Sequence, residues 1–311
     1  MAALTDYKLF TPLHLDDLEL KNRVVFEAAA ISEQGYGWHH AAACYTDAHV
    51  EGWKRVTERV HKKGGKIFLQ MWHMGRQAHS SYNSKGEIVS ASALRLEIGH
   101  TRDVNYVAQD YETPRFDGVE IHSANGYLID QFLQSCTNKR GDKYGGSFEN
   151  RARLLIEIVE AVKMAVPSHR IGVRLSPNGS LAGMGSEDNY EMFKYAMERL
   201  STYNLGYLAI LDGVGFGYTD KCRLITAFDA KTAFKGIVMA NNSYTRDRAE
   251  GAIGTGAVDM VGFGRLYISN PDLAERFQND WPLAPQAEPN VYYNSSLGGK
   301  GYNDFPSYNE A

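Results

Sequence analysis

The stretch Asp117-Gly-Val-Glu-Ile-His122, followed at once by Ser-Ala-Asn-Gly-Tyr127, decides the fold of this chain. A short apolar run that is bounded by Asp and Gly and ends in polar residues is typical of a buried parallel strand. Six more runs of this kind recur, at residues 23–30, 66–72, 170–175, 207–211, 236–240 and 260–264. We therefore expect a largely parallel sheet whose strands are covered on both faces.

Helical patterns lie between several of these strands, at residues 47–62, 149–166, 189–203 and 246–255. Alternation of strands and helices, without an internal repeat or a low-complexity linker, favours one parallel α/β domain over residues 1–311. A chain of 311 residues could instead hold two small domains. However, α/β barrels commonly run to about 250 residues or more as one domain.

Two places depart from regular alternation. The run Arg23-Val-Val-Phe-Glu-Ala-Ala-Ala-Ile-Ser32 reads like two strands joined end to end. It leaves no room for the dozen or more residues that a crossover between parallel strands needs. Between the strands at 66–72 and 117–122, the chain is polar and poor in helical pattern. The predicted fold is therefore an incomplete version of a regular alternating barrel.

Composition excludes several classes of protein. The chain is 43% hydrophobic and 23% charged, with a formal net charge of −4 and no long basic block. Nucleic acid and anionic membranes are therefore not expected as partners. The start of the chain lacks the pattern of a signal peptide, and no apolar run reaches the roughly 20 residues of a membrane span. Three widely spaced cysteines (Cys44, Cys136 and Cys222) indicate reduced thiols and a cytoplasmic protein.

The strongest chemical signal is the pair His122 and Asn125 with Tyr127, directly after the strand at 117–122. In an α/β barrel, residues at the carboxyl ends of strands face the active site. His122 and Asn125 could hold a carbonyl oxygen as it gains negative charge, and Tyr127 could deliver a proton. Alternatively, His122 and Asn125 satisfy loop backbone and Tyr127 belongs to the core.

A second signal is Val261-Gly-Phe-Gly264-Arg265, after the last strand. Glycine allows close backbone approach, and barrels often place a phosphate site after their seventh and eighth strands. Arg265 could bind that phosphate in a bidentate manner, although a Gly-Arg pair is often merely a turn. No HExxH or CxxC pattern supports a metal site, so none is expected.

Two polar residues interrupt apolar strands. Gln70 lies in Phe68-Leu-Gln-Met-Trp72 and Arg174 in Val173-Arg-Leu-Ser-Pro177. A buried Gln or Arg needs partners, so each indicates a polar ligand or an internal network. The pyrimidine edge of a flavin would suit both, with Arg174 favouring the anionic reduced ring. An internal salt bridge is the alternative for Arg174.

Taken together, these motifs resemble the Old Yellow Enzyme family, which includes the plant 12-oxophytodienoate reductases. The resemblance covers nearly the whole chain. It rests on Leu9-Phe-Thr-Pro-Leu, Leu20-Lys-Asn-Arg-Val, Gly64-Gly-Lys-Ile-Phe-Leu-Gln-Met-Trp-His, Gly118-Val-Glu-Ile-His-Ser-Ala-Asn-Gly-Tyr-Leu-Ile-Asp-Gln-Phe, Asp142-Lys-Tyr-Gly-Gly-Ser-Phe-Glu-Asn-Arg, Phe263-Gly-Arg-Leu-Tyr-Ile-Ser-Asn-Pro-Asp-Leu and Gly301-Tyr-Asn-Asp-Phe-Pro.

The resemblance implies a (β/α)₈ TIM barrel that holds FMN at its mouth. NAD(P)H, with NADPH as the expected reductant, would reduce the FMN, and an enone or enal would reoxidise it. His122 and Asn125 would hold the substrate carbonyl and Tyr127 would protonate the α-carbon. A monomer or homodimer is expected. The remaining implied contacts are FMN with Ala28, Gln70, Arg174, Asn242, Gly264 and Arg265, and substrate with Trp72 and Tyr302.

Three departures from the family pattern matter. Phe26 runs directly into Glu27, so a flavin-contacting segment and a helix of the family are missing, and the helix before Phe116 is missing too. Ala240-Asn-Asn242 replaces the usual glycine-rich turn, but Asn tolerates positive φ, so the backbone of Asn242 could still contact phosphate.

Two accounts of the missing segments stay open on sequence alone. Either the printed chain omits flexible parts of the protein, or the protein lacks them. In the second case the barrel would expose apolar strand faces, and weak FMN binding and aggregation are expected. The alternative function is then a degenerate barrel without FMN that acts as a binding protein, or a non-functional truncated product.

Overall fold

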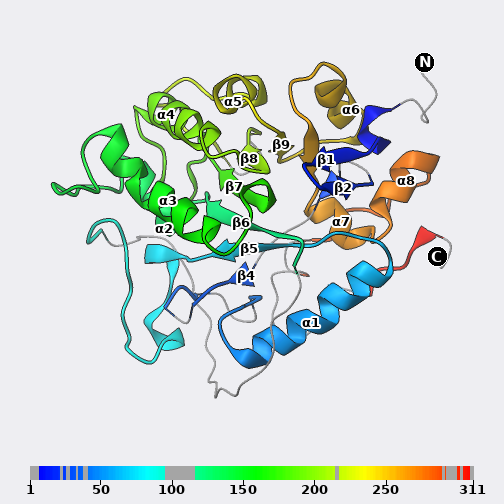
Figure 1. The fold of residues 1–311 in the computed structure, drawn as a ribbon, viewed down its shortest axis with the longest axis horizontal. Coiled ribbons are helices and arrows are strands. Elements are labelled where there is room, and N and C mark those ends of the chain that lie inside the picture. The colour runs from blue at the N-terminus through cyan, green and yellow to red at the C-terminus, as the bar shows by residue number, and fades with distance from the viewer. Residues whose placement is uncertain are drawn as a thin grey trace.

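Eight strands form one parallel sheet among the residues that the structure describes (Figure 1). The computed structural model describes residues 7–21, 24–25, 29–32, 34–37, 41–94, 116–213, 217–288, 291, 300–301 and 304–308, with the backbone alone at 24–25 and 29–30. The sheet order is β3-β10-β9-β8-β7-β6-β5-β4. Its strands are β3 (Val24–Val25), β4 (Ala29–Ala30), β5 (Phe68–Trp72), β6 (Gly118–Ser123), β7 (Ile171–Leu175), β8 (Tyr207–Leu211), β9 (Val238–Asn241) and β10 (Met260–Gly262).

The two strands at the ends of the sheet are consecutive in the chain. β3 pairs with β10, and β4 pairs with β5. Only residues 26–28 separate them, so Val25 and Ala29 lie at most about 14 Å apart, the reach of four extended residues. A sheet whose first and last strands are tied so closely must curve into a barrel. The prediction of two strands joined end to end, without a helix between them, is therefore confirmed.

Helices cover the outside of the barrel. α3, α4, α5 and α6 lie around β6 to β10, whereas α1 lies apart from them (Figure 1). β7 and β8 are buried along their whole length, as expected for strands between a barrel interior and a helix layer. The helices are α1 (Asp47–Lys62), α2 (Leu128–Leu133), α3 (Phe148–Lys163), α4 (Asn189–Ser201), α5 (Ala227–Phe234), α6 (Arg246–Gly254), α7 (Arg265–Ser269) and α8 (Leu273–Asn279).

Side-chain hydrogen bonds fix where the main helices begin. The hydroxyl of Ser147 accepts from the backbone N–H of Asn150 at the start of α3. At the start of α5, Thr226 and Asp229 form a reciprocal capping box. Each such cap satisfies a backbone donor that the first helical turn leaves without a partner, and contributes about 1 kcal/mol.

The inward side chains of the strands pack around a small hairpin, β1 (Leu13–Leu15) and β2 (Leu18–Leu20). Leu15 and Leu18 form one buried cluster with Tyr207, Met239 and other inward residues of β8 to β10. Among the described residues, the hairpin therefore fills the amino-terminal end of the barrel. The sequence patterns did not predict it, because three-residue strands have too short a period to recognise.

Two glycines make room for rings inside this closed end. A Cβ atom at Gly118 would lie 2.3 Å from the ring of Phe68, and one at Gly172 would lie 2.3 Å from the ring of Tyr207. The two rings meet edge to face, 5.9 Å apart. Glycine in these two strands is thus explained by the space that the rings need, not by backbone conformation.

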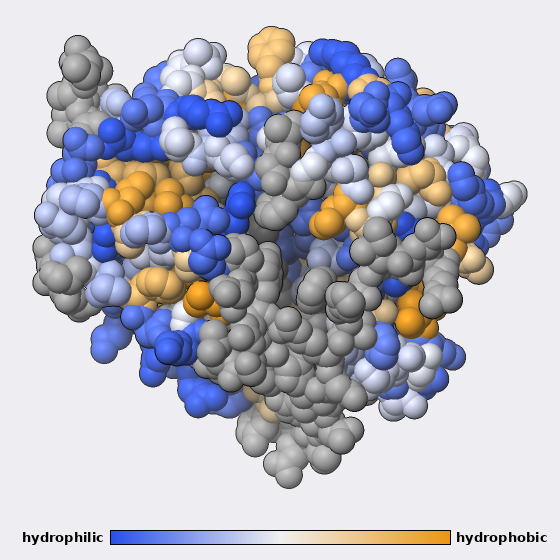
Figure 2. Space-filling model, turned by 180° about the vertical axis from the view of Figure 1, so that it is seen from behind, coloured by the Kyte–Doolittle hydropathy of each residue, from blue (hydrophilic) through white to orange (hydrophobic). Residues whose placement is uncertain are grey.

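The predicted helices at 47–62, 149–166, 189–203 and 246–255 correspond to α1, α3, α4 and α6, and their ends differ by three residues or fewer. Between β5 and β6, the described residues contain two short 3-10 turns, Gly75–Gln77 and Ser80–Tyr82. Seen from behind, the described surface is mostly hydrophilic, with apolar residues in separate small groups (Figure 2). No helix among the described residues has both the length and the apolarity that a bilayer crossing requires.

Candidate active site

Trp72, His122 and Tyr127 lie against one another at the carboxyl ends of β5 and β6. The ring of Trp72 stacks on that of His122 at 6.3 Å and meets that of Tyr127 edge to face at 4.9 Å. The rings of His122 and Tyr127 are 5.1 Å apart. The structure therefore brings together three of the side chains that the sequence singled out, although Tyr127 lies beyond the end of its strand.

His122 is a neutral donor in this setting. The residue is 6% exposed, and burial lowers its pKa to about 3. Its Nδ1 atom accepts a hydrogen bond of 3.3 Å from the backbone N–H of Ala124. Because a neutral imidazole with an accepting Nδ1 carries its proton on Nε2, His122 presents one N–H donor on its other side.

Asn125 lies at the top of a left-handed turn. Its φ is 59° and that of Gly126 is 73°, so the loop reverses sharply after β6. The backbone N–H of Asn125 donates to Oγ of Ser176 at 2.7 Å, and Nε2 of Gln77 donates to the carbonyl of Asn125 at 3.0 Å. The side-chain amide of Asn125 makes no hydrogen bond with another described residue. The backbone is thus held in place while the amide is available to a ligand.

Asp130 anchors the same turn from below. It is fully buried and accepts from the backbone N–H of Gly126 and from Nε2 of Gln134, both at 2.8 Å. The hydroxyl of Ser176, which holds Asn125, donates to it at 3.4 Å. Burial raises the pKa of Asp130 to about 7, against the opposing effect of these hydrogen bonds. The carboxyl group is therefore partly protonated near neutral pH.

Gln70 and Glu120 face each other inside the barrel. They are register partners on β5 and β6, and are 2% and 3% exposed. Nε2 of Gln70 donates to Oε1 of Glu120, and a hydrogen bond links Glu120 to Tyr207. Burial raises the pKa of Glu120, and these two hydrogen bonds oppose the rise. Oε1 of Gln70 is buried and has no hydrogen-bond partner among the described residues.

Arg174 lies in the same interior, on β7 next to His122 in the sheet. Burial lowers its pKa to about 10, so the guanidinium stays charged at neutral pH. Nη2 of Arg174 donates to Oδ1 of Asn241 at 3.1 Å, and Nδ2 of Asn241 donates to the carbonyl of Gly262 at 2.8 Å. Asn241 thus ties the cationic group to the last strand of the barrel.

The ends of β9 and β10 lie side by side, since Asn241 is paired with Gly262. Asn242 is 6% exposed and has a φ of 91°, which agrees with the expectation that Asn tolerates such a backbone here. Its Nδ2 atom is buried without a hydrogen-bond partner among the described residues. Gly264 caps α7, whose first residue is Arg265, and a Cβ at Gly264 would meet no atom within 4 Å. No atom of the described residues therefore fills the space next to Gly264.

Comparison with known proteins decides the family. Residues 24–284 match the model of the NADH:flavin oxidoreductase / NADH oxidase family. The chain belongs to this family, that of Old Yellow Enzyme. It is 33% identical to putative 12-oxophytodienoate reductase 11 of Oryza sativa subsp. japonica, over 91% of this chain and 84% of the relative. It is also 33% identical to a probable flavin mononucleotide-dependent alkene reductase of Leishmania infantum, over 94% of this chain and 86% of the relative.

A solved structure agrees with this assignment. The Old Yellow Enzyme homologue of Zymomonas mobilis is 32% identical and superposes with a TM-score of 0.86, over 96% of this chain and 99% of that one. The chain is therefore a flavin oxidoreductase of the Old Yellow Enzyme family, with an α/β barrel fold. The fold prediction is confirmed, and so is the irregularity at the first strand, where β3 and β4 share one short passage of chain.

In this Old Yellow Enzyme relative, two predicted site residues, Ala28 and Tyr302, lie outside the described residues.

Four residues that hold the site together were not predicted from the sequence. Glu120, Asp130 and Asn241 are buried or half-buried polar residues beside predicted ones, and Tyr207 begins a strand. Glu120 carried the same signal as Gln70, a polar residue at an inward position of an apolar strand. Asp130 had no such signal, because only the tertiary fold places it under the turn.

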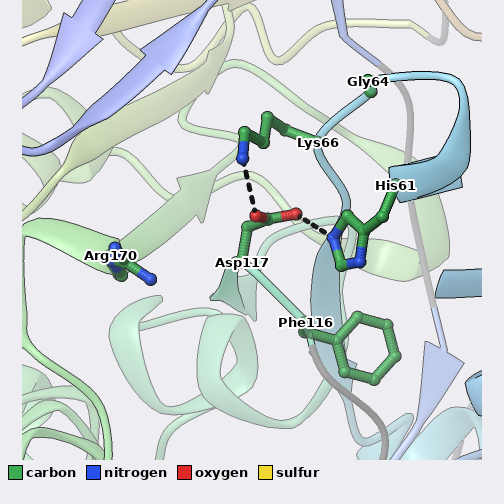
Figure 3. A pocket seen from close by; sticks show the side chains of 7 residues that line it. His61, Gly64, Lys66, Phe116, Asp117 and Arg170 are labelled. Carbon is green, nitrogen blue, oxygen red and sulfur yellow. Dashed lines mark hydrogen bonds and ion pairs between the residues drawn. The ribbon is translucent and has the colours of Figure 1, made fainter. Parts of the chain in front are cut away.

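A pocket of about 520 Å³ lies at the other end of the barrel and does not belong to this site. It is lined by residues that precede β5, β6 and β7. In Figure 3, Lys66 and His61 point toward Asp117 from either side. Nε2 of His61 lies 2.8 Å from Oδ2 of Asp117, and Nζ of Lys66 lies 3.3 Å from Oδ1. Asp117 thus ties α1 to the start of β6, which indicates a structural role.

Proposed function

We propose that this chain is an FMN-dependent ene-reductase that uses NADPH to reduce the C=C bond of enones and enals. One observation supports this most strongly: a buried, neutral His122 offers its Nε2–H beside the ring of Tyr127, three residues before Asn125. Donors that are neutral and pre-positioned stabilise negative charge as it develops on a carbonyl oxygen, without protonating the oxygen first. A charged imidazolium would be a poorer match, because it would bind anions in the ground state.

The interior of the barrel fits the polar edge of a flavin. It offers a buried acceptor, Oε1 of Gln70, that has no hydrogen-bond partner among the described residues, and a buried cation, Arg174. An imide has an N–H that needs an acceptor and carbonyl oxygens that need donors, so this pair of residues complements it. Asn242, Gly264 and Arg265 border an open turn at the ends of β9 and β10, where a phosphate would find backbone and guanidinium donors.

In the proposed reaction, His122 and Asn125 donate hydrogen bonds to the substrate carbonyl oxygen. FMN, when bound and reduced, supplies the hydride that adds to the β-carbon. Tyr127 then gives the proton of its hydroxyl to the α-carbon, which completes the addition of two hydrogens. Trp72 packs against both His122 and Tyr127, so it borders the space where the substrate would lie.

The experiment that tests this function uses the chain of 311 residues. The purified protein should show a flavin absorbance band, or gain one on titration with FMN, and should oxidise NADPH when an enone is added. The reduced product, with its C=C bond saturated, should appear in equal amount. A protein that folds but fails to bind FMN would refute the proposal. The single FMN-binding domain, the cytoplasmic location and the monomeric or homodimeric state stay predictions.

A further inference from the structure

We infer that Glu120 is a positioning residue that fixes the side-chain amide of Gln70 with its oxygen toward the flavin, so that the site recognises the ring N–H of the flavin. This inference rests on the proposed function. It assigns a role to a buried carboxyl group that the proposed reaction does not use. The ligand then meets the oxygen end of the Gln70 amide and not its nitrogen end.

The contact between the two side chains fixes the amide. An ionised carboxylate only accepts hydrogen bonds, so it selects the nitrogen end of the Gln70 amide, and Nε2 of Gln70 does donate to Oε1 of Glu120. The hydroxyl of Tyr207 donates to the same carboxyl group, and both hydrogen bonds favour its ionised form. The orientation of Gln70 is thus the one that an ionised Glu120 requires.

Glu120 is itself held from its other side. A hydrogen bond joins it to Tyr207, whose ring occupies the space left by Gly172. The charge of Arg174 lowers the pKa of Tyr207, whereas the pKa of Glu120 is shifted by burial, Gln70 and Tyr207. Gln70, Glu120 and Tyr207 come from three different strands of the barrel. The carboxyl group thus accepts hydrogen bonds from side chains on two other strands.

Gln70 therefore offers the ligand one acceptor, its Oε1 atom. Oε1 of Gln70 is buried and without a hydrogen-bond partner among the described residues, which is costly unless a bound group donates to it. The oxidised flavin ring carries one N–H, at N3. A flavin that is methylated at N3 lacks this donor, so wild-type protein should bind FMN at least tenfold more tightly than N3-methyl-FMN, as expected for roughly one lost buried hydrogen bond.

The substitution Glu120→Gln should reverse the amide. Tyr207 donates to the oxygen of the new side chain, so the nitrogen of the new side chain faces Gln70. The amide of Gln70 must then turn its own oxygen toward that nitrogen to accept. The N–H group of Gln70 then meets the N–H group of the flavin. FMN binding should weaken, and the preference for FMN over N3-methyl-FMN should fall to about threefold or less. Tyr207→Phe is the matched control, because it leaves the contact of Glu120 with Gln70 in place and should keep the preference.

The test measures flavin fluorescence quenching by the full chain, freed of bound flavin, in titrations with FMN and with N3-methyl-FMN. In a Gln70→Ala background, Glu120→Gln should change neither affinity, which separates positioning from a general structural effect. If Glu120→Gln does not fold, as judged by circular dichroism, Glu120→Asp replaces it, since its shorter side chain withdraws from Gln70. A Glu120 variant that retains the wild-type preference overturns the inference. Wild-type protein that binds neither flavin overturns the proposed function instead.

Discussion

Replacing Asp130 by Asn should make the stability of this protein less dependent on pH. Asp130 is fully buried under the turn that holds Asn125, and burial raises its pKa from 3.8 to about 7. A carboxyl group whose pKa is higher in the folded state binds its proton more tightly there. Its contribution to stability is therefore full below pH 3.8 and is lost as the pH rises to about 7.

The size of the effect follows from the two pKa values. A difference of about 3 pH units corresponds to about 4 kcal/mol, at about 1.4 kcal/mol for each unit. About 3 kcal/mol of this lies between pH 4.5 and 7.5. The amide that replaces the carboxyl group does not titrate, so the free energy of unfolding of Asp130→Asn minus that of wild type should rise by this amount across the interval. A constant offset is expected in addition, because the new amide N–H faces Nε2 of Gln134.

The assay is urea denaturation followed by far-UV circular dichroism at several pH values between 4.5 and 7.5. Asp220→Asn is the matched control, since Asp220 is exposed and its replacement makes the same chemical change on the surface. Its difference from wild type should stay flat. If the difference in free energy of unfolding between Asp130→Asn and wild type also changes by less than about 1 kcal/mol over this interval, burial does not raise the pKa of Asp130 as we infer.

Three further predictions concern the site and the barrel interior. Tyr127→Phe should slow enone reduction by at least about tenfold, because the phenol gives its proton to the substrate. The rate of FMN reduction by NADPH, followed by stopped-flow absorbance, should stay nearly unchanged. Equal losses in both half-reactions would show that Tyr127 is not the proton donor. His122→Ala should abolish the long-wavelength charge-transfer band that a bound phenol gives with FMN, and an undiminished band in a spectral titration would mean that Nε2–H does not bind the ligand oxygen. Gly172→Ala should cost about 1–3 kcal/mol in thermal unfolding, because its Cβ would lie 2.3 Å from the ring of Tyr207. Gly251→Ala in α6, where a Cβ meets nothing within 4 Å, should instead stabilise by about 0.5–1 kcal/mol, and similar changes in both variants would contradict the packing argument.

Local sequence was enough to predict most strands of the barrel. Runs such as Tyr207–Leu211 are apolar throughout, and a strand that is buried on both faces leaves that pattern whatever surrounds it. The shortage of chain between residues 23 and 32 also predicted the unusual passage of β3 into β4, because three residues cannot form a crossover. The candidate residues Gln70, His122 and Arg174 were visible as polar side chains inside apolar strands.

Only the tertiary structure decided how these side chains are oriented and charged. The neutral state of His122, the turn of the Gln70 amide and the raised pKa of Asp130 all depend on burial and on partners from distant segments. Glu120 is 50 residues from Gln70 in the chain, and Ser176 is 51 residues from Asn125. Periodicity reports which face of a strand is buried, but not which polar group lies opposite. That pairing arises only when the sheet closes and brings the strands into register.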